Sequence, residues 1–139
     1  MVKNIEADDA LGLKQDPGTM ICSIDKDLLM CEGNHYNFVK KTFTNVTKDQ
    51  GTEFFYQQML TGDSADNIVG IRGLGNVKAK KILNNTLRKN WDNMIIDRYI
   101  DEFGYSEGRN RCVQNSQLLW ILQKNKQMPM DFSYEQVQK

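Results

Sequence analysis

Carboxylates in closely spaced groups are the residues of this sequence with the clearest capacity for chemistry. Seven of them lie in three short groups: Glu6, Asp8 and Asp9; Asp25 and Asp27; Asp63 and Asp66. Brought together, they would raise one another's pKa unless cations neutralised them. Oxygen ligands favour hard cations such as Mg²⁺ or Mn²⁺, and two such ions about 3.5–4 Å apart are a common device for hydrolysing phosphodiesters. Each group alone is also typical of a cap or turn, so this prediction depends on all three together.

The spacing within each group indicates the element that would present it. Glu6 and Asp9 are three residues apart and would share one face of a helix predicted over residues 4–13. The second group follows a predicted strand, and in extended chain its two side chains would point the same way. They would lie at the carboxyl end of that strand, where ligands of open α/β sheets collect. The third group would lie on one side of a helical turn.

A glycine-rich stretch followed by lysines is the second feature with chemical potential. Residues 70–75 alternate glycine with other residues and open a predicted helix over 76–83. Glycines let a phosphate approach the backbone, and the free N–H groups of the helix start can bind it. The residues expected to contact a polyanion backbone are Gly70, Arg72, Gly73, Gly75, Lys78, Lys80 and Lys81. A plain tight turn between two helices would also account for this stretch.

The charges of the chain are balanced in total but unevenly distributed. Lysine and arginine number 18, and aspartate and glutamate also number 18. Residues 1–32 hold seven acids and three bases, whereas residues 71–90 hold six bases and no acid. This distribution indicates cation binding at one end and polyanion binding in the basic stretch. Two ordinary solvated faces would give the same pattern.

The elements that must hold these groups belong to a mostly helical α/β chain. At 139 residues the chain matches one domain of about 100–200 residues. Residues 19–24 resemble a buried parallel strand for which the chain supplies no obvious neighbours, and residues 35–43 are a strand or hairpin arm. The remaining elements are predicted helices over residues 52–60, 76–83, 91–103 and 108–123. His35 is expected in a structural or surface role. Five aromatic residues are expected in the core by their helical spacing: Phe54, Phe55, Tyr56, Trp91 and Trp120.

The composition excludes some classes of protein. The longest apolar stretch, residues 118–122, is too short to span a membrane, so no membrane partner is expected. Three cysteines without metal-ligand spacing fit reduced thiols and a cytoplasmic protein.

Four motifs, in this order, resemble those of the 5′→3′ exonuclease and flap endonuclease family, with phage exonucleases the most similar. They are residues 6–9 (Glu-Ala-Asp-Asp), 23–28 (Ser-Ile-Asp-Lys-Asp-Leu), 62–68 (Gly-Asp-Ser-Ala-Asp-Asn-Ile) and 70–75 (Gly-Ile-Arg-Gly-Leu-Gly). The resemblance implies the C-terminal part of a PIN-like nuclease core with a helix–hairpin–helix element. It implies a partial core with an acidic metal site over 1–50, a DNA-binding and helical region over 51–127, and a flexible tail over 128–139.

The resemblance also implies cofactors and roles. It implies two Mg²⁺ or Mn²⁺ ions, with a K⁺ ion at the helix–hairpin–helix. The first metal would take Glu6, Asp8, Asp9 and Asp25, and the second would take Asp27, Asp63 and Asp66, with Asp25 near both. Residues 68–81 would bind the backbone of duplex DNA. The expected activity is hydrolysis of DNA near 5′ ends, flaps or nicks, in the cytoplasm of a phage's host cell.

The sequence departs from the family pattern before its first motif. Family members carry a stretch there that supplies a sheet strand, further aspartates and a basic helical arch, and this chain has five residues before Glu6. A separately encoded N-terminal half is therefore expected as a partner. A non-catalytic DNA-binding module is the alternative. A third possibility is an interaction protein whose sheet edge pairs with a partner or a second copy of the chain.

Overall fold

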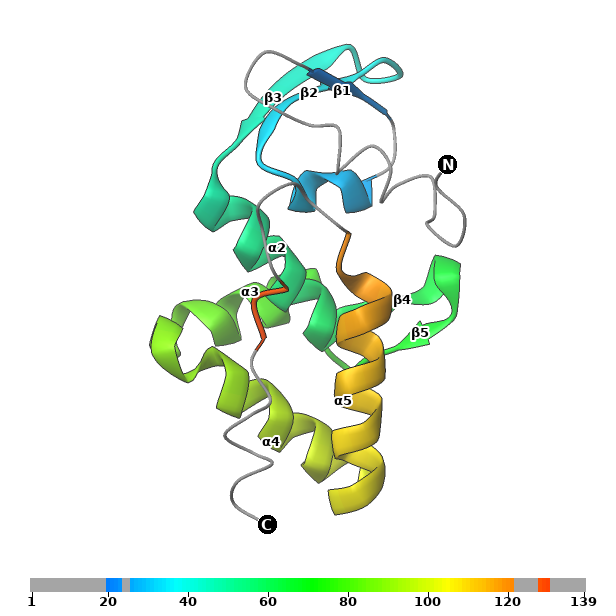
Figure 1. The fold of residues 1–139 in the computed structure, drawn as a ribbon, viewed down its shortest axis with the longest axis vertical. Helices are drawn as coiled ribbons and strands as arrows, with labels where there is room; N and C mark the ends of the chain where they lie inside the picture. Colours follow the sequence, from blue (N-terminus) through cyan, green and yellow to red (C-terminus); the bar gives the residue numbers. More distant parts are fainter. Residues whose placement is uncertain (1–19, 24–25, 122–127, 131–139) are drawn as a thin grey trace. The chain divides into compact units, whose positions relative to one another are not determined.

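The computed structural model describes residues 20–23, 26–121 and 128–130, and it divides the chain into two units (Figure 1). The first comprises Met1–Phe54 with Trp120–Met128, and the second comprises Phe55–Leu119 with Pro129–Lys139. The helix expected over residues 4–13 lies outside the described residues. So do four of the seven candidate carboxylates: Glu6, Asp8, Asp9 and Asp25.

The first unit contains a three-stranded sheet. Strand β1 (Met20–Cys22) pairs in parallel with β2 (Gly33–Asn37), which pairs antiparallel with β3 (Thr42–Val46). The strand predicted over residues 19–24 is confirmed. Its neighbours, which were not obvious from the sequence, form a hairpin of mostly polar residues. Such a segment lacks the apolar run by which a buried strand is recognised. The strand or hairpin arm predicted over residues 35–43 overlaps both strands of this hairpin and includes its turn.

The sheet is buried on one side only, which also corrects the prediction of a fully buried strand. Ile21 is buried, while Met20 and Cys22 on either side of it are exposed. The register places His35 of β2 opposite Ile21, and its side chain is buried as well. Its Nε2–H donates to the carbonyl oxygen of Cys31 at 2.7 Å. The only histidine of the chain therefore has the structural role expected from the sequence.

The core of the first unit forms around a short 3₁₀ helix, η1 (Lys26–Met30). Leu28 and Met30 are almost fully buried. The backbone N–H of Ile121 donates to the sulfur of Met30 at 3.4 Å. A Cβ added at Gly51 would lie 2.3 Å from the carbonyl oxygen of Met30, so only glycine fits where the next helix crosses η1.

Helix α2 (Lys48–Thr61) begins four residues before the predicted start at Thr52. The reason is a reciprocal cap. The N–H of Gln50 donates to Thr47 Oγ1 at 3.1 Å, and the N–H of Thr47 donates to Gln50 Oε1 at 2.9 Å. This capping box satisfies donors that the first helical turn leaves without partners.

The second unit is helical apart from one small hairpin. Its elements after α2 are β4 (Gly62–Asp63), η2 (Ser64–Asp66), β5 (Ile68–Val69), α3 (Asn76–Asn84), η3 (Arg88–Asn90), α4 (Trp91–Phe103) and α5 (Tyr105–Leu119). Helices α3 and α4 match the prediction closely. Helix α5 begins earlier and ends earlier than predicted, because Gly104, with φ of 92°, turns the chain directly into it.

Aromatic side chains form the core of the second unit. Phe55, Tyr56 and Trp91 are buried, as expected. The indole Nε1–H of Trp91 donates to the carbonyl oxygens of Leu83 and Thr86, at 3.1 and 3.0 Å. Trp91 thereby fixes the C-terminal end of α3. Helices α4 and α5 pack so closely that a Cβ on Gly108 would lie 2.4 Å from the carbonyl oxygen of Tyr99.

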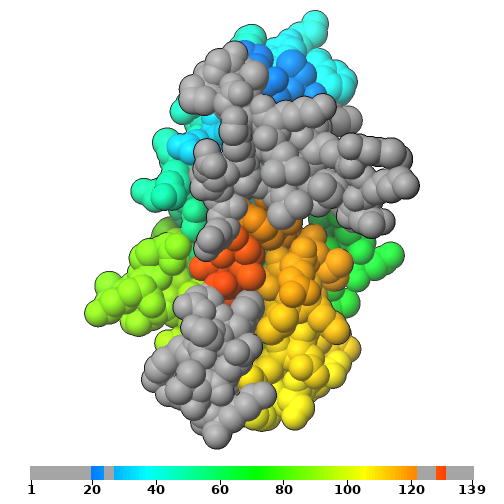
Figure 2. Space-filling model, in the orientation of Figure 1, coloured from blue at the N-terminus to red at the C-terminus, as the bar shows by residue number. Residues whose placement is uncertain are grey.

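Helix α5 forms much of the visible surface of the second unit in Figure 2, where it runs from yellow to orange. None of the helices in the described ranges is long and apolar enough to span a lipid bilayer.

The three thiols should differ sharply in reactivity. Cys22 is exposed, Cys31 and Cys112 are buried, and burial raises the pKa of Cys112 to about 12. Because the thiolate is the reactive form, iodoacetamide at pH 8 should modify Cys22 well before the other two cysteines. Peptide mass spectrometry over a time course measures the order of labelling. Equal labelling of Cys112 and Cys22 in the folded protein would contradict the burial of Cys112.

Candidate metal and phosphate-binding sites

Two of the candidate carboxylates lie together on a small hairpin, residues 62–69, which we call the acidic hairpin. Asp63 ends β4 and is buried, while Asp66 lies in η2 and is exposed. Asp63 Oδ1 accepts a hydrogen bond from the N–H of Ala65 at 3.0 Å and so caps η2. One carboxylate oxygen from each aspartate lies within 4.8 Å of the other. A hard cation could be shared across this separation.

Close backbone packing shapes the base of the acidic hairpin. Gly62 has a φ of 72°, and a Cβ added at Gly70 would lie 2.4 Å from the nitrogen of Gly62. The N–H of Ile71 donates to the carbonyl oxygen of Leu60 at 2.9 Å. The absence of a side chain at Gly70 is thus explained by contact with Gly62, and its contact with a phosphate stays a prediction.

Replacing Gly70 with alanine should destabilise the fold. The added methyl group would meet backbone atoms that cannot rotate away, and overpacking of this kind costs about 1–3 kcal/mol. The free energy of unfolding in urea, followed by circular dichroism, measures the effect. Gly75→Ala is the matched control, because a Cβ there meets no atom within 4 Å and its φ is −88°. We expect this control to lose less than about 1 kcal/mol; equal losses would contradict the packing role of Gly70.

We call the segment between the acidic hairpin and α3, residues 70–75, the glycine loop; its backbone is open at Gly73 and Gly75. Gly73 has a φ of 78°, and a Cβ added at Gly73 or Gly75 would meet no atom within 4 Å. Gly75 is the N-cap of α3 and offers no side chain to its first turn. The first helical hydrogen bond runs from the N–H of Ala79 to the carbonyl oxygen of Gly75 at 2.9 Å. The positive end of α3 is therefore left for an anion.

Basic side chains surround this helix start. Lys78, Lys80 and Lys81 are exposed on α3, whereas Ala79 and Leu83 face the core. Lys78 and Lys81 are one turn apart and share a face of the helix. The structure thus brings the predicted lysines together on one helix beside the glycine loop.

An acid from α4 contacts the glycine loop, and no motif of the sequence pointed to it. Glu102 Oε1 accepts a hydrogen bond from the backbone N–H of Arg72 at 3.2 Å and lies 3.9 Å from Arg72 Nε. The Arg72 side chain is otherwise 94% exposed. Glu102 holds the loop and also reduces its positive charge. The two residues are 30 positions apart, and no short-range pattern reveals such a pair.

Asp27 departs from the local geometry predicted for it. It lies in the 3₁₀ helix η1, so it is not in the extended conformation that would align it with its neighbour two residues before. It belongs to the first unit, whereas Asp63 and Asp66 belong to the second. The grouping of all seven carboxylates in one centre stays a prediction.

No family model matches the chain, but a curated protein and a solved structure are both similar to it. The sequence is 31% identical over 150 residues to a 5′-3′ exonuclease of Mycoplasmopsis pulmonis (strain UAB CTIP), a match that covers 94% of this chain and 50% of that protein. The structure of a mutant T5 5′-exonuclease matches with a TM-score of 0.52 and 20% identity, covering 83% of this chain and 52% of that one. The chain thus spans about half the length of these relatives.

The fold class expected from the sequence is confirmed: a mostly helical chain with a small sheet, matching a PIN-like nuclease fold and its helical part. Both comparisons are to 5′-exonucleases, and together they support a 5′-nuclease family assignment that covers the C-terminal half of such proteins.

Proposed function

We propose that this chain is the C-terminal half of a 5′→3′ exodeoxyribonuclease or flap endonuclease that hydrolyses DNA phosphodiesters near 5′ ends. One observation carries the proposal. The close carboxylates of Asp63 and Asp66 and the open helix start of α3 follow one another along the chain within one unit. Carboxylates that hold a cation and a loop that binds phosphates are the two parts that such a reaction needs.

The donor set of the acidic hairpin fits Mg²⁺ or Mn²⁺. Both ligands are carboxylates, and a carboxylate can cap a helix with one oxygen and bind an ion through the other. When bound, the ions would supply activated water and neutralise the leaving oxygen. Asp63 and Asp66 would orient one ion, together with Asp27. Glu6, Asp8, Asp9 and Asp25 would hold the other, with Asp25 near both.

The glycine loop and α3 would hold the DNA. The N–H groups at the start of α3 would bind one phosphate, and the side chains of Arg72, Lys78, Lys80 and Lys81 would contact others. Such contacts give affinity without reading the base sequence. Backbone carbonyl groups of residues 68–81 would hold the expected K⁺ ion. The remaining part of the nuclease would come from a separately encoded N-terminal half or a second copy of the chain, in the cytoplasm of a host cell.

A nuclease assay tests the proposal directly. The chain is incubated with 5′-flap and nicked duplex DNA in Mn²⁺ and in Mg²⁺, alone and with a polypeptide covering the other half of the Mycoplasmopsis relative. We expect metal-dependent cleavage that starts at the 5′ end. Binding of DNA with no cleavage under any of these conditions would overturn the nuclease and favour the alternative.

That alternative is a non-catalytic DNA-binding module, and one observation favours it. The glycine loop and α3 are both present within the second unit, and they need no metal to bind phosphates. In this case DNA binding would survive in EDTA, and substitutions of the carboxylates would change no function.

Glu102→Gln should tighten DNA binding. Glutamine keeps an acceptor for the N–H of Arg72 but removes the negative charge beside the loop. Exposed ion pairs contribute about 0.2–1 kcal/mol, so we expect a roughly two- to fivefold lower dissociation constant. Fluorescence anisotropy with a labelled duplex in low salt measures it.

The matched control for Glu102 is Glu107→Gln. It removes the same charge from an exposed acid of α5, which pairs with Arg111 at 2.8 Å. An equal gain in both variants would show that only net charge matters, and weaker binding in Glu102→Gln would show that its carboxylate supports the loop.

A further inference from the structure

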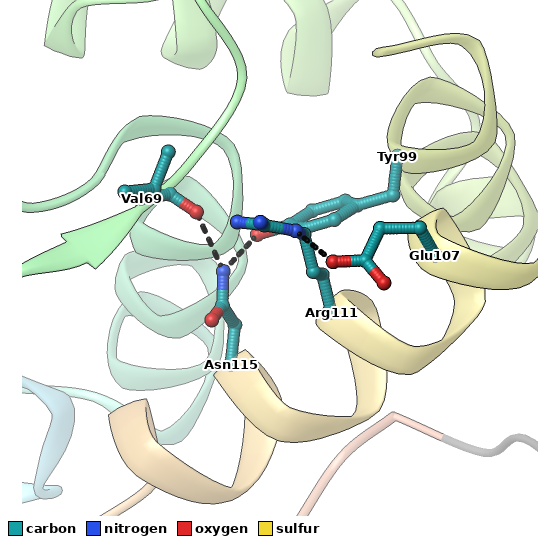
Figure 3. A network of polar contacts seen from close by, with 5 residues as sticks. All are labelled: Val69, Tyr99, Glu107, Arg111 and Asn115. Atoms are coloured by element: carbon teal, nitrogen blue, oxygen red, sulfur yellow. Dashed lines mark hydrogen bonds and ion pairs between the residues drawn. The ribbon is translucent and has the colours of Figure 1, made fainter. Parts of the chain in front are cut away.

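A buried amide connects α5 to the acidic hairpin. Asn115 is 8% exposed, and its Nδ2 donates two hydrogen bonds. One goes to the backbone carbonyl oxygen of Val69 at 2.8 Å, and the other goes to the hydroxyl of Tyr99 at 2.9 Å. Figure 3 shows the amide between these two oxygens. Both hydrogens of the amide group are thus used inside the protein.

The hydrogen bonds of Asn115 continue through Tyr99 to helix α2, which precedes the acidic hairpin. The Tyr99 hydroxyl donates to the carbonyl oxygen of Met59 at 2.6 Å. Burial raises the pKa of Tyr99, so the hydroxyl keeps its proton at physiological pH. Asn115 therefore lies in a chain of hydrogen bonds that joins α2, α4 and α5 to β5. Such a network has a defined geometry, because each buried polar group lost from it leaves another without a partner.

The pairing of β5 with β4 links the position of Val69 to that of the acidic residues. Val69, which accepts from Asn115, pairs with Gly62, and Ile68 pairs with Asp63. Asp66 lies in the turn between the two strands. A shift of β5 would therefore move the backbone that bears both carboxylates.

We propose that Asn115 is a positioning residue for the candidate metal site on the acidic hairpin. By holding β5 through the Val69 carbonyl, it keeps Asp63 and Asp66 at a separation that one cation can bridge. The inference rests on the proposed function for its metal. Substituting groups that orient metal ligands typically weakens metal binding about 10- to 100-fold.

Two variants of Asn115 and two comparison variants test this role. Asn115→Leu and Asn115→Asp both lack the two N–H donors. Aspartate keeps the volume of asparagine, and leucine is larger but keeps the branching at Cγ. Ser116→Ala is the matched control, because Ser116 is buried beside Asn115 but donates to Val113 within α5 at 2.6 Å. Tyr99→Phe removes the hydroxyl and retains the bond from Asn115 to Val69.

Two readouts apply to every variant: the Mn²⁺ dissociation constant by electron paramagnetic resonance, and hydrogen exchange of amides in residues 62–71. For both Asn115 variants we expect an approximately tenfold or greater rise in the dissociation constant and faster exchange in this segment. For Ser116→Ala we expect neither change, and for Tyr99→Phe a change of less than about threefold in the dissociation constant.

The outcomes separate this inference from the proposed function. If the parent chain binds no Mn²⁺ while the Asn115 variants still loosen the acidic hairpin, the metal site fails and the anchoring role of Asn115 is retained. Exchange and Mn²⁺ binding that match the Ser116→Ala control would overturn the positioning role. If Asn115→Leu does not fold, the same two readouts on Asn115→Asp decide between these outcomes.

Discussion

Changing both Asp63 and Asp66 to asparagine is expected to abolish metal-dependent cleavage, lowering the rate on the order of 10³-fold. The two carboxylates are the close acidic pair of the second unit, with oxygens within 4.8 Å, and their charge is what a divalent cation would bind. Asparagine is also a good N-cap, so the bond from Ala65 N–H to position 63 can persist. The double variant should therefore fold like the parent.

Single-turnover cleavage of a 5′-flap duplex in Mn²⁺ measures the effect, in whichever assembly of the parent chain is active. Ser64→Ala is the matched control, because Ser64 is an exposed residue of the same hairpin without a charge. It should cleave at the rate of the parent. A double variant that still cleaves within tenfold of the parent would show that these carboxylates are not part of the active centre.

The second large effect is expected from Lys78 and Lys81, changed together to alanine. Both are exposed on one face of α3, beside the open helix start. Each lysine that contacts a phosphate contributes about one unit to the slope of log affinity against log salt concentration. The double variant should therefore bind duplex DNA more weakly, with a slope smaller by about two units. Anisotropy titrations at several salt concentrations give both quantities.

A control with equal charge removes Lys40 and Lys41, which are exposed in the first unit. This pair should leave the salt slope nearly unchanged. Should both double variants lose affinity and slope alike, the binding would reflect net charge, and α3 would not be a specific backbone contact.

Local patterns were sufficient to predict the helices. The helical spacing of apolar residues predicts α4 with both of its ends, Trp91 and Phe103. It also predicts α3, with an error of one residue at the C-terminal end. The early start of α2 depends on Thr47 and Gln50, whose side chains cap the helix from outside its apolar pattern. Boundaries set by side-chain caps are therefore less visible in hydrophobic periodicity than the helices themselves.

The sheet was harder to predict because its signal is not local. Strand β1 has an apolar residue at its centre, but β2 is Gly-Asn-His-Tyr-Asn, and the arm predicted over residues 35–43 misses where this strand begins and ends. Only the pairing of β2 with both neighbours satisfies its backbone groups. A strand of this kind is specified by its partners more than by its own composition.

The candidate site likewise contains some features with a local signal in the sequence and others that depend on distant residues. Asp63 and Asp66 are three residues apart, and the lysines of α3 also lie within three residues of one another. Spacing along the chain is therefore informative for both groups. Glu102 and Asn115 reach their partners over 30 and 46 residues, respectively. Such contacts depend on how helices pack, which no single segment encodes. The structure shows why position 70 is glycine, through the approach of Gly62, and the phosphate contact expected for Gly70 stays a prediction.

The contact between Gly62 and Gly70 has a consequence for how this region could change. The backbones of Gly62 and Gly70 pack closely against each other at the base of the acidic hairpin. The N–H of Ile71 donates a hydrogen bond to the carbonyl oxygen of Leu60 across the same base. The tip between them can then accept residues of other kinds or number while the flanking helices keep their places. The residues between Gly62 and Gly70 can thus be replaced as one segment, and a replacement of different length could change which metal ion the hairpin prefers.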